Sequence, residues 1–236
     1  MQRFLNQKIN ITTVLLSHPL FATLSRDEVA RLAARSRVHR FNAGQYLWHS
    51  GNSPKHLCLV VSGLLQTSVE TRGGATSILE LIKPGDVCGC LAHLHLGASL
   101  CDLRAVTDAS VVLVPASEAF ARGMGNPAWF RALAHNISLR FSRQISLRLI
   151  VTSNSRLKIP ALLLWLGESI GATIPLTQAV IAMVAGINEA TVCRALAPLK
   201  RRNLIQISRG VVKILSIRTL EDHLRETKKV SRLRRR

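Results

Sequence analysis

Six polar residues near the C-terminus have the chemistry needed to bind nucleic acid. Arginine can donate two hydrogen bonds to a guanine edge, glutamate can accept one from cytosine, and hydroxyl or amide groups can bind bases or phosphates. Such contacts require the side chains to lie together on one exposed face of a helix. The candidates are Thr177, Gln178, Asn188, Glu189, Thr191 and Arg194.

Two short helices with a glycine between them would position these residues. Thr177 can cap a helix that runs through Ala185, Gly186 suits a left-handed turn, and a second helix is predicted from about Glu189 to Arg201. An ordinary helical hairpin is the alternative, but the register of the inward positions favours a DNA-binding helix-turn-helix. Those positions are apolar, with a small residue where the helices cross: Ile181, Ala182, Ala185, Ile187, Val192 and Ala195.

A predicted β-hairpin follows the second helix. Its strands, Leu204–Ile207 and Val211–Leu215, are joined through Ser208-Arg209-Gly210, so Arg209 lies at the tip, where it can contact the DNA backbone. Residues 200–202 are Lys-Arg-Arg, and phosphate contact and plain surface charge are equally good interpretations of them. The helices and the hairpin together predict a winged helix-turn-helix.

The charge of the chain favours a polyanionic partner. The formal net charge is +19, with 32 Lys and Arg against 13 Asp and Glu. Residues 194–236 alone hold 14 basic and three acidic residues, although the end of this segment, Lys228–Arg236, is also consistent with a solvated tail. Nucleic acid is the usual partner of such a chain, and an acidic membrane surface is the second.

Membrane segments and enzyme motifs are not evident in the sequence. Apolar runs such as Ala161–Leu166 are far shorter than the roughly 20 residues of a membrane span, and the first ten residues lack the pattern of a signal peptide. We find no nucleophile elbow, phosphate-binding glycine loop or zinc-protease helix, and the acidic residues are scattered. We therefore expect a cytoplasmic protein with no membrane partner and no enzymatic activity.

The first half of the chain predicts a helical segment followed by a β domain. Ser25 can cap a helix that runs through Val29 and Leu32. Between residues 37 and 115, β-prone runs alternate with Gly or Pro turns, which is typical of an antiparallel sandwich or barrel. The predicted strands are Gln45–His49, Leu57–Val61, Leu64–Glu70, Ala75–Ile82, Leu103–Val106 and Ser110–Val114.

A long helix is predicted from Pro127 to about Ser153. Asn126 caps it, Pro127 takes its first position, and no Gly or Pro follows until Pro160. An apolar stripe at spacings of three or four residues makes it a natural dimer interface, and packing on the chain's own β domain is the alternative. The stripe is Phe130, Ala134, Ile137, Phe141, Ile145 and Leu149. A second helix, Ser155–Gly167, follows, and Gly171–Pro175 breaks the chain again.

Four segments together resemble the CRP/FNR superfamily of bacterial transcription regulators. They are residues 19–25 (PLFATLS), 59–63 (LVVSG), 83–89 (KPGDVCG) and 176–205. The resemblance implies an α+β fold with an N-terminal β-roll, the jelly roll of cyclic-nucleotide-binding domains, over residues 1–125. It further implies a dimerisation helix (126–154) and a winged helix-turn-helix with a basic tail (155–236). Family members are homodimers on pseudo-palindromic double-stranded DNA, with an effector that reorients the DNA-reading heads and with RNA polymerase as a partner.

The predicted effector pocket departs from the cyclic-nucleotide members of this family. Those members hold the phosphate with Gly-Glu and a later Arg-Ser or Arg-Thr, whereas this chain has Gly89-Cys90 and either Ser99-Leu100 or Leu100-Cys101. No Lys or Arg lies between Lys83 and Arg104 to supply a charge-assisted hydrogen bond. We therefore expect no cyclic AMP binding of the usual kind, and either an unknown small molecule or no effector. The predicted pocket residues are Leu81, Gly89, Cys90, Ser99, Leu100 and Cys101.

The second predicted helix departs from the family as well. Arg194 matches the arginine that members share, but Glu189-Ala190 stand where many have Arg-Glu or Glu. Arg194 would bind guanine. Glu189 would either accept a hydrogen bond from cytosine or only start the helix. The operator would therefore differ from the family's usual half-site. Cys193 lies beside Arg194, where oxidation near DNA is conceivable. The first cysteine is Cys58, so the N-terminal cysteine cluster of the iron–sulfur members is absent.

A cluster of cysteine and histidine lies where the family keeps its effector. Cys88, Cys90, His93, His95 and Cys101 fall within 14 residues. Such ligands can hold a metal or haem iron or act as a redox switch, whereas cysteines in β domains are more often small core residues and the histidines can lie on a surface loop. We predict no metal and no cofactor, with a redox, metal or haem sensor as the alternative.

Overall fold

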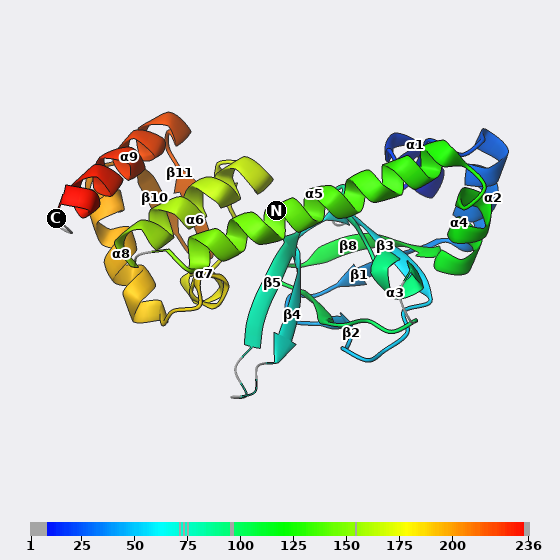
Figure 1. The fold of residues 1–236 in the computed structure, drawn as a ribbon, viewed down its shortest axis with the longest axis horizontal. Helices are drawn as coiled ribbons and strands as arrows, with labels where there is room; N and C mark the ends of the chain where they lie inside the picture. The colour runs from blue at the N-terminus through cyan, green and yellow to red at the C-terminus, as the bar shows by residue number, and fades with distance from the viewer. Residues whose placement is uncertain are drawn as a thin grey trace. The chain divides into compact units, whose positions relative to one another are not determined.

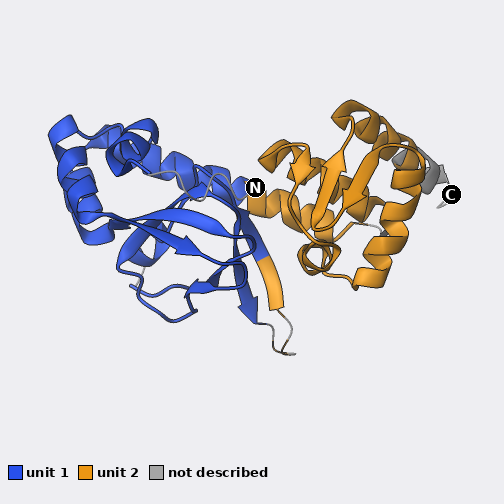
Figure 2. Ribbon diagram, turned by 180° about the vertical axis from the view of Figure 1, so that it is seen from behind, with its two compact units in different colours: residues 1–70, 79–142 blue, residues 71–78, 143–236 orange. Residues whose placement is uncertain are grey.

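The computed structural model describes residues 9–70, 72, 74, 76–94, 97–153 and 155–233. The chain divides into two compact units (Figure 2). Unit 1 comprises residues 1–70 and 79–142, and unit 2 comprises residues 71–78 and 143–236. The three-part division predicted from the sequence stays a prediction.

Two short helices, α1 (Ile11–Ser17) and α2 (Arg26–Arg35), open the described part of unit 1. Ser25 and Glu28 form a capping box at the start of α2. Ser25 Oγ accepts a hydrogen bond from the Glu28 N–H at 3.3 Å, and the Ser25 N–H donates to Glu28 Oε2 at 2.8 Å. The cap predicted at Ser25 is therefore confirmed.

A buried histidine links the α1–α2 connection to a distant turn. His18 Nδ1 accepts a hydrogen bond from the Leu20 N–H at 3.2 Å, and His18 Nε2 donates to the Gly85 carbonyl at 3.0 Å. One ring nitrogen accepts and the other donates, so this arrangement requires the neutral imidazole.

Two four-stranded sheets form the β-roll of unit 1, with strand orders β1-β8-β3-β6 and β2-β7-β4-β5 (Figure 1). Two short helices, α3 (Cys90–Leu94) and α4 (Ala116–Gly123), accompany them. The strands are β1 (Arg37–Phe41), β2 (Tyr46–Trp48), β3 (His56–Ser62), β4 (Leu65–Glu70), β5 (Thr76–Ile82), β6 (Val87–Cys88), β7 (Asp102–Ala105) and β8 (Ala109–Pro115).

The six predicted strands are all present, and the sequence missed β1 and β6. In β1, Arg37, His39 and Arg40 are exposed, so its apolar pattern is weak, and its position is set by backbone pairing with β8. Strand β6 has only two residues, too few to show a period. Both strands are therefore defined by their neighbours in the sheet rather than by their own composition.

The alternation of side chains along β3 builds two buried clusters. Leu57 and Leu59 lie in one cluster with Phe21, Leu32 and other residues of the helices. Cys58 and Val60 lie in the other, which is made by strands. Successive side chains of a strand point to opposite faces, so one strand supplies both clusters.

Helix α5 (Pro127–Val151) is uninterrupted (Figure 1). Asn126 Oδ1 caps it by accepting hydrogen bonds from the N–H groups of Ala128, at 2.9 Å, and Trp129, at 3.2 Å. Its 25 residues span about 37 Å. Trp129 and Leu133 are fully buried and fix one face of α5 to the core of unit 1.

Unit 2 combines helices with a three-stranded sheet of order β10-β11-β9. Helix α6 was predicted three residues shorter, and the short strand β9 was read as part of a chain break. The elements are α6 (Ser155–Ile170), β9 (Thr173–Ile174), α7 (Gln178–Ala185), α8 (Glu189–Arg201), β10 (Ile205–Ser208), β11 (Val211–Ile214) and α9 (Ile217–Leu233). Within the described ranges, no single helix is long and apolar enough to cross a membrane. The bent pair of α7 and α8 has the length and composition of a broken membrane span, and no other feature marks it as one.

The sequence did not predict α9. Its charged residues made the segment resemble a solvated tail, but Leu220 is fully buried and α9 packs against α6. Arg202, at the end of α8, donates a hydrogen bond from Nη1 to His223 Nδ1 at 2.9 Å. A single buried face and this polar contact hold α9 to unit 2 despite its overall polarity.

Candidate nucleic-acid interface

Helices α7 and α8 meet at a sharp angle of 108°. Thr177 Oγ1 caps α7 by accepting from the Val180 N–H at 3.2 Å. Gly186 ends α7 with a φ of +63°, the left-handed conformation that glycine adopts without strain, and the following Ile187 N–H donates to the Ala182 carbonyl at 3.1 Å. The cap, the turn and the bend agree with a helix-turn-helix, whose two helices cross at about 90–120°.

The apolar backs of the two helices are buried together. Ile181, Ala185 and Val192 have no exposed surface, and Ala182 is 4% exposed. Ile187 and Ala195, also predicted to face inward, are only half-buried. Because these residues occupy one side of α7 and α8, the polar residues of α8 are left on the opposite, solvent side.

A series of hydrogen bonds orders the exposed face of α8. Arg194 Nε donates to the Ala190 carbonyl at 3.3 Å, and Arg194 Nη2 donates to Thr191 Oγ1 at 3.1 Å. Thr191 Oγ1 in turn donates to Asn188 Oδ1 at 2.7 Å, and the same oxygen of Asn188 caps α8 by accepting from the Thr191 N–H at 2.8 Å. The guanidinium of Arg194 remains exposed to solvent. The Arg194–Thr191–Asn188 series therefore orients an arginine without burying it.

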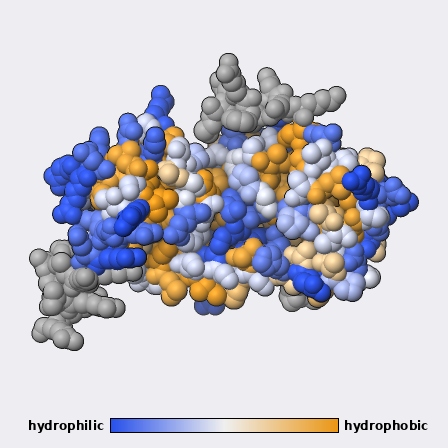
Figure 3. Space-filling model, turned by 90° about the horizontal axis from the view of Figure 1, so that it is seen from above, coloured by the Kyte–Doolittle hydropathy of each residue, from blue (hydrophilic) through white to orange (hydrophobic). Residues whose placement is uncertain are grey.

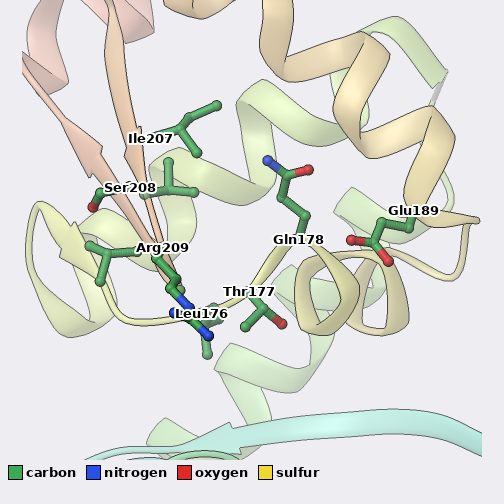
Figure 4. Close-up of a pocket in the computed structure, with 10 residues that line it drawn as sticks. Leu176, Thr177, Gln178, Glu189, Ile207, Ser208 and Arg209 are labelled. Atoms are coloured by element: carbon green, nitrogen blue, oxygen red, sulfur yellow. The ribbon is translucent and has the colours of Figure 1, made fainter.

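The β10–β11 hairpin places Arg209 beside this face. Ser208 pairs with Val211, so the connecting turn is Arg209-Gly210, and Gly210 has a φ of +73°. Figure 4 shows Arg209 on one side of a cleft, Glu189 on the other, and Thr177 and Gln178 between them. The cleft has a volume of about 240 Å³ and is lined by Leu176, Thr177, Gln178, Glu189, Ile207, Ser208, Arg209, Gly210, Val211 and Val212.

One contact in this face was not predicted from the sequence. Cys193 Sγ donates a hydrogen bond to Gln178 Oε1 at 2.7 Å, which joins α8 to the first residue of α7. From the sequence, Cys193 was only an oxidisable group beside Arg194. In the structure its thiol contacts the amide of Gln178. Its spacing from Gln178 gave no signal, since the contact depends on the crossing of the helices.

Known proteins match both parts of the chain. A model of the cyclic nucleotide-binding domain matches residues 38–124, and a model of the Crp-like helix-turn-helix domain matches residues 158–223. The chain is 27% identical over 194 residues to the HTH-type transcriptional regulator Cmr of Mycobacterium tuberculosis, covering 82% of this chain and 78% of Cmr. It is 24% identical over 210 residues to a cyclic AMP receptor protein of Thermus thermophilus, covering 86% and 95% respectively.

This chain belongs to the CRP/FNR superfamily of transcription regulators.

Solved structures of the superfamily share the fold. FixK2 of Bradyrhizobium japonicum superposes with a TM-score of 0.68 at 18% identity, covering 79% of this chain and 96% of FixK2. A CRP-family regulator of Thermus thermophilus superposes with a TM-score of 0.65 at 22% identity, with the same coverage. The predicted α+β fold, with a β-roll, a long helix and a winged helix-turn-helix, is confirmed. This CRP/FNR regulator binds DNA through its helix-turn-helix.

The β-roll of this CRP/FNR regulator contains a cavity of about 190 Å³. Four of the six predicted pocket residues, Gly89, Ser99, Leu100 and Cys101, line it. Leu81 and Cys90 do not: Leu81 follows Glu80 on β5 and so points to the opposite face of the strand, and Cys90 packs in the core. The other lining residues are Trp48, Thr67, Cys88, Leu91, Ala92, Ala98 and Arg140.

A cation that was not predicted from the sequence, Arg140, reaches this cavity from α5. Arg140 Nε and Nη2 donate to the two carboxylate oxygens of Glu80 at 2.9 and 2.7 Å, and Arg140 Nη1 donates to the Val87 carbonyl at 2.8 Å. Burial alone would lower the pKa of Arg140, but the hydrogen bonds and charge of Glu80 raise it. The lone acidic residue in the apolar run Ile78–Ile82 was the sequence signal that a buried cation exists.

The cysteine and histidine cluster does not assemble a ligand set within the described residues. No three His, Cys, Asp or Glu side chains there lie close enough together to hold a metal ion. His93 Nε2 donates to the Pro54 carbonyl at 2.9 Å, and His95 lies outside the described residues. Burial raises the pKa of the Cys90 thiol to about 12 and also raises that of Cys101. These two thiols are therefore protonated at neutral pH, a poor state for binding metal or reacting with oxidants.

The predicted dimer stripe on α5 is largely uncovered by the chain itself. Phe130, Phe141, Ile145 and Leu149 are 51%, 61%, 46% and 68% exposed, and Ala134 is exposed as well. Ile137 is half-buried against the core of unit 1. Figure 3 shows apolar residues exposed as orange patches on one face of the molecule. The use of this stripe as an interface stays a prediction.

Proposed function

We propose that this regulator acts as a homodimer on a pseudo-palindromic operator, with the first turns of each α8 in a major groove. The observation that carries the proposal is the Arg194–Thr191–Asn188 series, which orients an exposed guanidinium on the first half of α8. An arginine held in this way can donate two hydrogen bonds to the O6 and N7 atoms of one guanine. Its side-chain entropy is already reduced before DNA binds, which favours selective binding.

The other residues predicted to contact DNA fall into two groups, those suited to phosphate and one suited to a base edge. Thr177 and Gln178, at the start of α7, and Arg209, at the wing tip, surround the cleft beside α8 and suit phosphate contacts. Glu189 lies in the first turn of α8, where the helix dipole stabilises its negative charge. Glu189 either accepts a hydrogen bond from the N4 amino group of a cytosine or only stabilises the start of α8. Substituting the base pair opposite Glu189 in the operator distinguishes these two roles.

The dimer would form through α5. The exposed stripe Phe130, Ala134, Phe141, Ile145 and Leu149 recurs along one side of the helix, away from the side that Trp129 and Leu133 bury. Pairing two such stripes would remove several large apolar side chains from water. A two-fold dimer would present two copies of α8, and their half-site centres on DNA would lie about 34–36 Å apart.

Double-stranded DNA and a second copy of the chain are therefore the proposed partners. RNA polymerase is the third, since a bound regulator changes transcription by favouring or blocking the polymerase at the promoter. The proposed site of action is the cytoplasm, where a bacterial chromosome lies.

A fluorescence-anisotropy titration tests this proposal. An operator is first selected from genomic fragments with the full-length protein, and affinity is then measured for the operator, a single half-site and a scrambled duplex between 50 and 200 mM salt. We expect the operator to bind about 10³-fold or more tightly than the scrambled duplex, and the affinity to fall steeply with salt. Equal affinity for all three duplexes would reduce the protein to a general basic DNA binder and contradict the proposal.

A further inference from the structure

The cavity of the β-roll is small, apolar and open at an apolar rim. Its volume is about 190 Å³, close to the roughly 150 Å³ of an apolar protein cavity that holds benzene. Leu91 and Leu100, at 55% and 71% exposed, belong to its lining. The size therefore suits an occupant of about one six-membered ring rather than a nucleotide.

The charge of the cavity lining is already balanced. Among the described residues that line the cavity, Arg140 alone is charged, and both carboxylate oxygens of Glu80, which is 1% exposed, accept hydrogen bonds from it. A phosphate or carboxylate entering the cavity would add a second negative charge beside one cation in a desolvated place, and an ammonium would add an uncompensated positive charge. Both would bind unfavourably, so the occupant is expected to be uncharged.

One polar group of the lining has no partner within the described chain. Thr67, on β4, is 6% exposed, lines the cavity, and its buried Oγ1 makes no hydrogen bond to any described residue. The neighbouring hydroxyl is different: Ser99 Oγ accepts from Trp48 Nε1 at 3.0 Å and donates to the Cys101 carbonyl at 2.7 Å. Because buried polar groups are nearly always hydrogen-bonded, Thr67 Oγ1 marks the point where an occupant would place an oxygen.

We propose that this cavity binds a small uncharged molecule of about one ring that carries a hydroxyl or carbonyl oxygen for Thr67. Apolar contacts with Trp48, Ala92 and Leu100 would hold the ring, and Thr67 Oγ1 would select the oxygen. Arg140 brings α5 into the lining, so the occupant touches the helix on which the dimer stripe lies. Binding at this cavity does not depend on the operator or on the dimer proposed above.

Four probe compounds test the proposal on the full-length protein: phenol, toluene, benzoate and cyclic AMP. Phenol is uncharged at pH 7, because a phenolic hydroxyl has a pKa near 10, and benzoate has the same ring with a negative charge. Isothermal titration gives the dissociation constants, and thermal unfolding gives the shift in midpoint. We expect phenol to bind and to raise the midpoint, toluene to bind up to about tenfold more weakly, and benzoate and cyclic AMP to bind at least tenfold more weakly than phenol.

Variants assign the binding to this cavity. Thr67→Val keeps the side-chain shape and removes the hydroxyl, so it should abolish the preference for phenol over toluene while leaving toluene affinity unchanged. Ser68→Ala, at the adjacent residue whose side chain points to the other face of β4, is the matched control and should change neither affinity. Ala98→Phe, at a half-exposed lining position that tolerates a larger side chain, should weaken both compounds.

Two results would overturn the proposal. One is tighter binding of benzoate or cyclic AMP than of phenol, which would mean that the Arg140–Glu80 pair does accept an anion. The other is phenol binding that neither Thr67→Val nor Ala98→Phe changes, which would place the compound elsewhere on the protein.

Discussion

Arg140 on α5 and Glu80 on β5 form a two-fold hydrogen-bonded ion pair that is almost completely buried. The two N···O distances are 2.9 and 2.7 Å, and the side chains are 13% and 1% exposed. Removing one member of such a pair leaves a buried charge without compensation, which costs far more than the pair itself contributes. The pair therefore makes the long helix and the β-roll dependent on each other within unit 1.

We expect Glu80→Gln to lower the free energy of unfolding by about 3 kcal/mol or more, because it leaves the Arg140 guanidinium uncompensated. Urea denaturation followed by circular dichroism measures the loss. The control is Glu118→Gln, which breaks the ion pairs of Glu118 with Arg35 (2.9 Å) and Arg122 (3.6 Å). Both pairs are more exposed than Arg140–Glu80, so this variant should cost about 1 kcal/mol. Equal losses in the two variants would mean that burial of the Arg140–Glu80 pair has no energetic consequence.

His18 makes the stability of unit 1 depend on pH. Burial lowers the pKa of His18 from 6.5 and outweighs the hydrogen bond to Gly85 and the charge of Asp86, which raise it. A histidine whose pKa is lower in the folded than in the unfolded state contributes stability that is complete above the unfolded value and is lost as the pH falls toward the folded one. The free energy of unfolding should therefore fall between about pH 7 and pH 5, by at most about 1.4 kcal/mol per pH unit for this group.

Denaturation curves of the parent protein and of His18→Gln at several pH values measure this contribution. The pKa values of His56 and His223 are also lowered by burial, so some pH dependence should remain in the variant. An unchanged pH dependence in His18→Gln would show that the protonation of His18 is not linked to folding.

The wing should contribute charge rather than selectivity. Arg209 lies on a two-residue turn at the tip of the hairpin, and we expect Arg209→Ala to weaken operator and scrambled duplex by similar factors. The slope of log affinity against log salt should become shallower by about one per chain, whereas Arg209→Lys should keep most of the slope. A loss confined to the operator would instead indicate that Arg209 contacts a base.

Dimerisation through α5 is tested by adding charge to its stripe. Phe141→Arg should produce monomers in sedimentation analysis, because it buries an unpaired charge if the stripes pair. Leu139→Arg is the matched control: Leu139 is also exposed, at 52%, but lies almost on the opposite side of the same helix. A dimer that survives Phe141→Arg and dissociates with Leu139→Arg would place the interface on the other face.

Features with short-range causes were predictable from the sequence. The caps at Ser25, Asn126 and Thr177 and the turn at Gly186 each depend on residues within a few positions, and all lie where the pattern placed them. The strands with strong apolar runs were equally clear. The helix-turn-helix was predictable because its buried residues repeat with a helical period in a segment of some 25 residues.

Features that depend on residues far apart in the sequence were not predictable from it. Strand β1 depends on pairing with β8, and α9 depends on the surface of α6. Arg140 and Glu80 are 60 residues apart in the sequence, so the position of one does not predict that it pairs with the other. For this reason the lack of Lys and Arg between residues 83 and 104 did not predict the cation that α5 supplies to the cavity.

The substitution Arg194→Ala is the sharpest test of DNA reading by α8. Binding is measured on the operator, on the operator with its contacted guanine replaced, and on scrambled DNA. We expect the variant to lose about 1–3 kcal/mol on the operator, far less on scrambled DNA, and nothing further when the guanine is replaced. If Arg194→Ala binds the operator with undiminished selectivity, α8 does not read the DNA through Arg194, and the account of this interface is wrong.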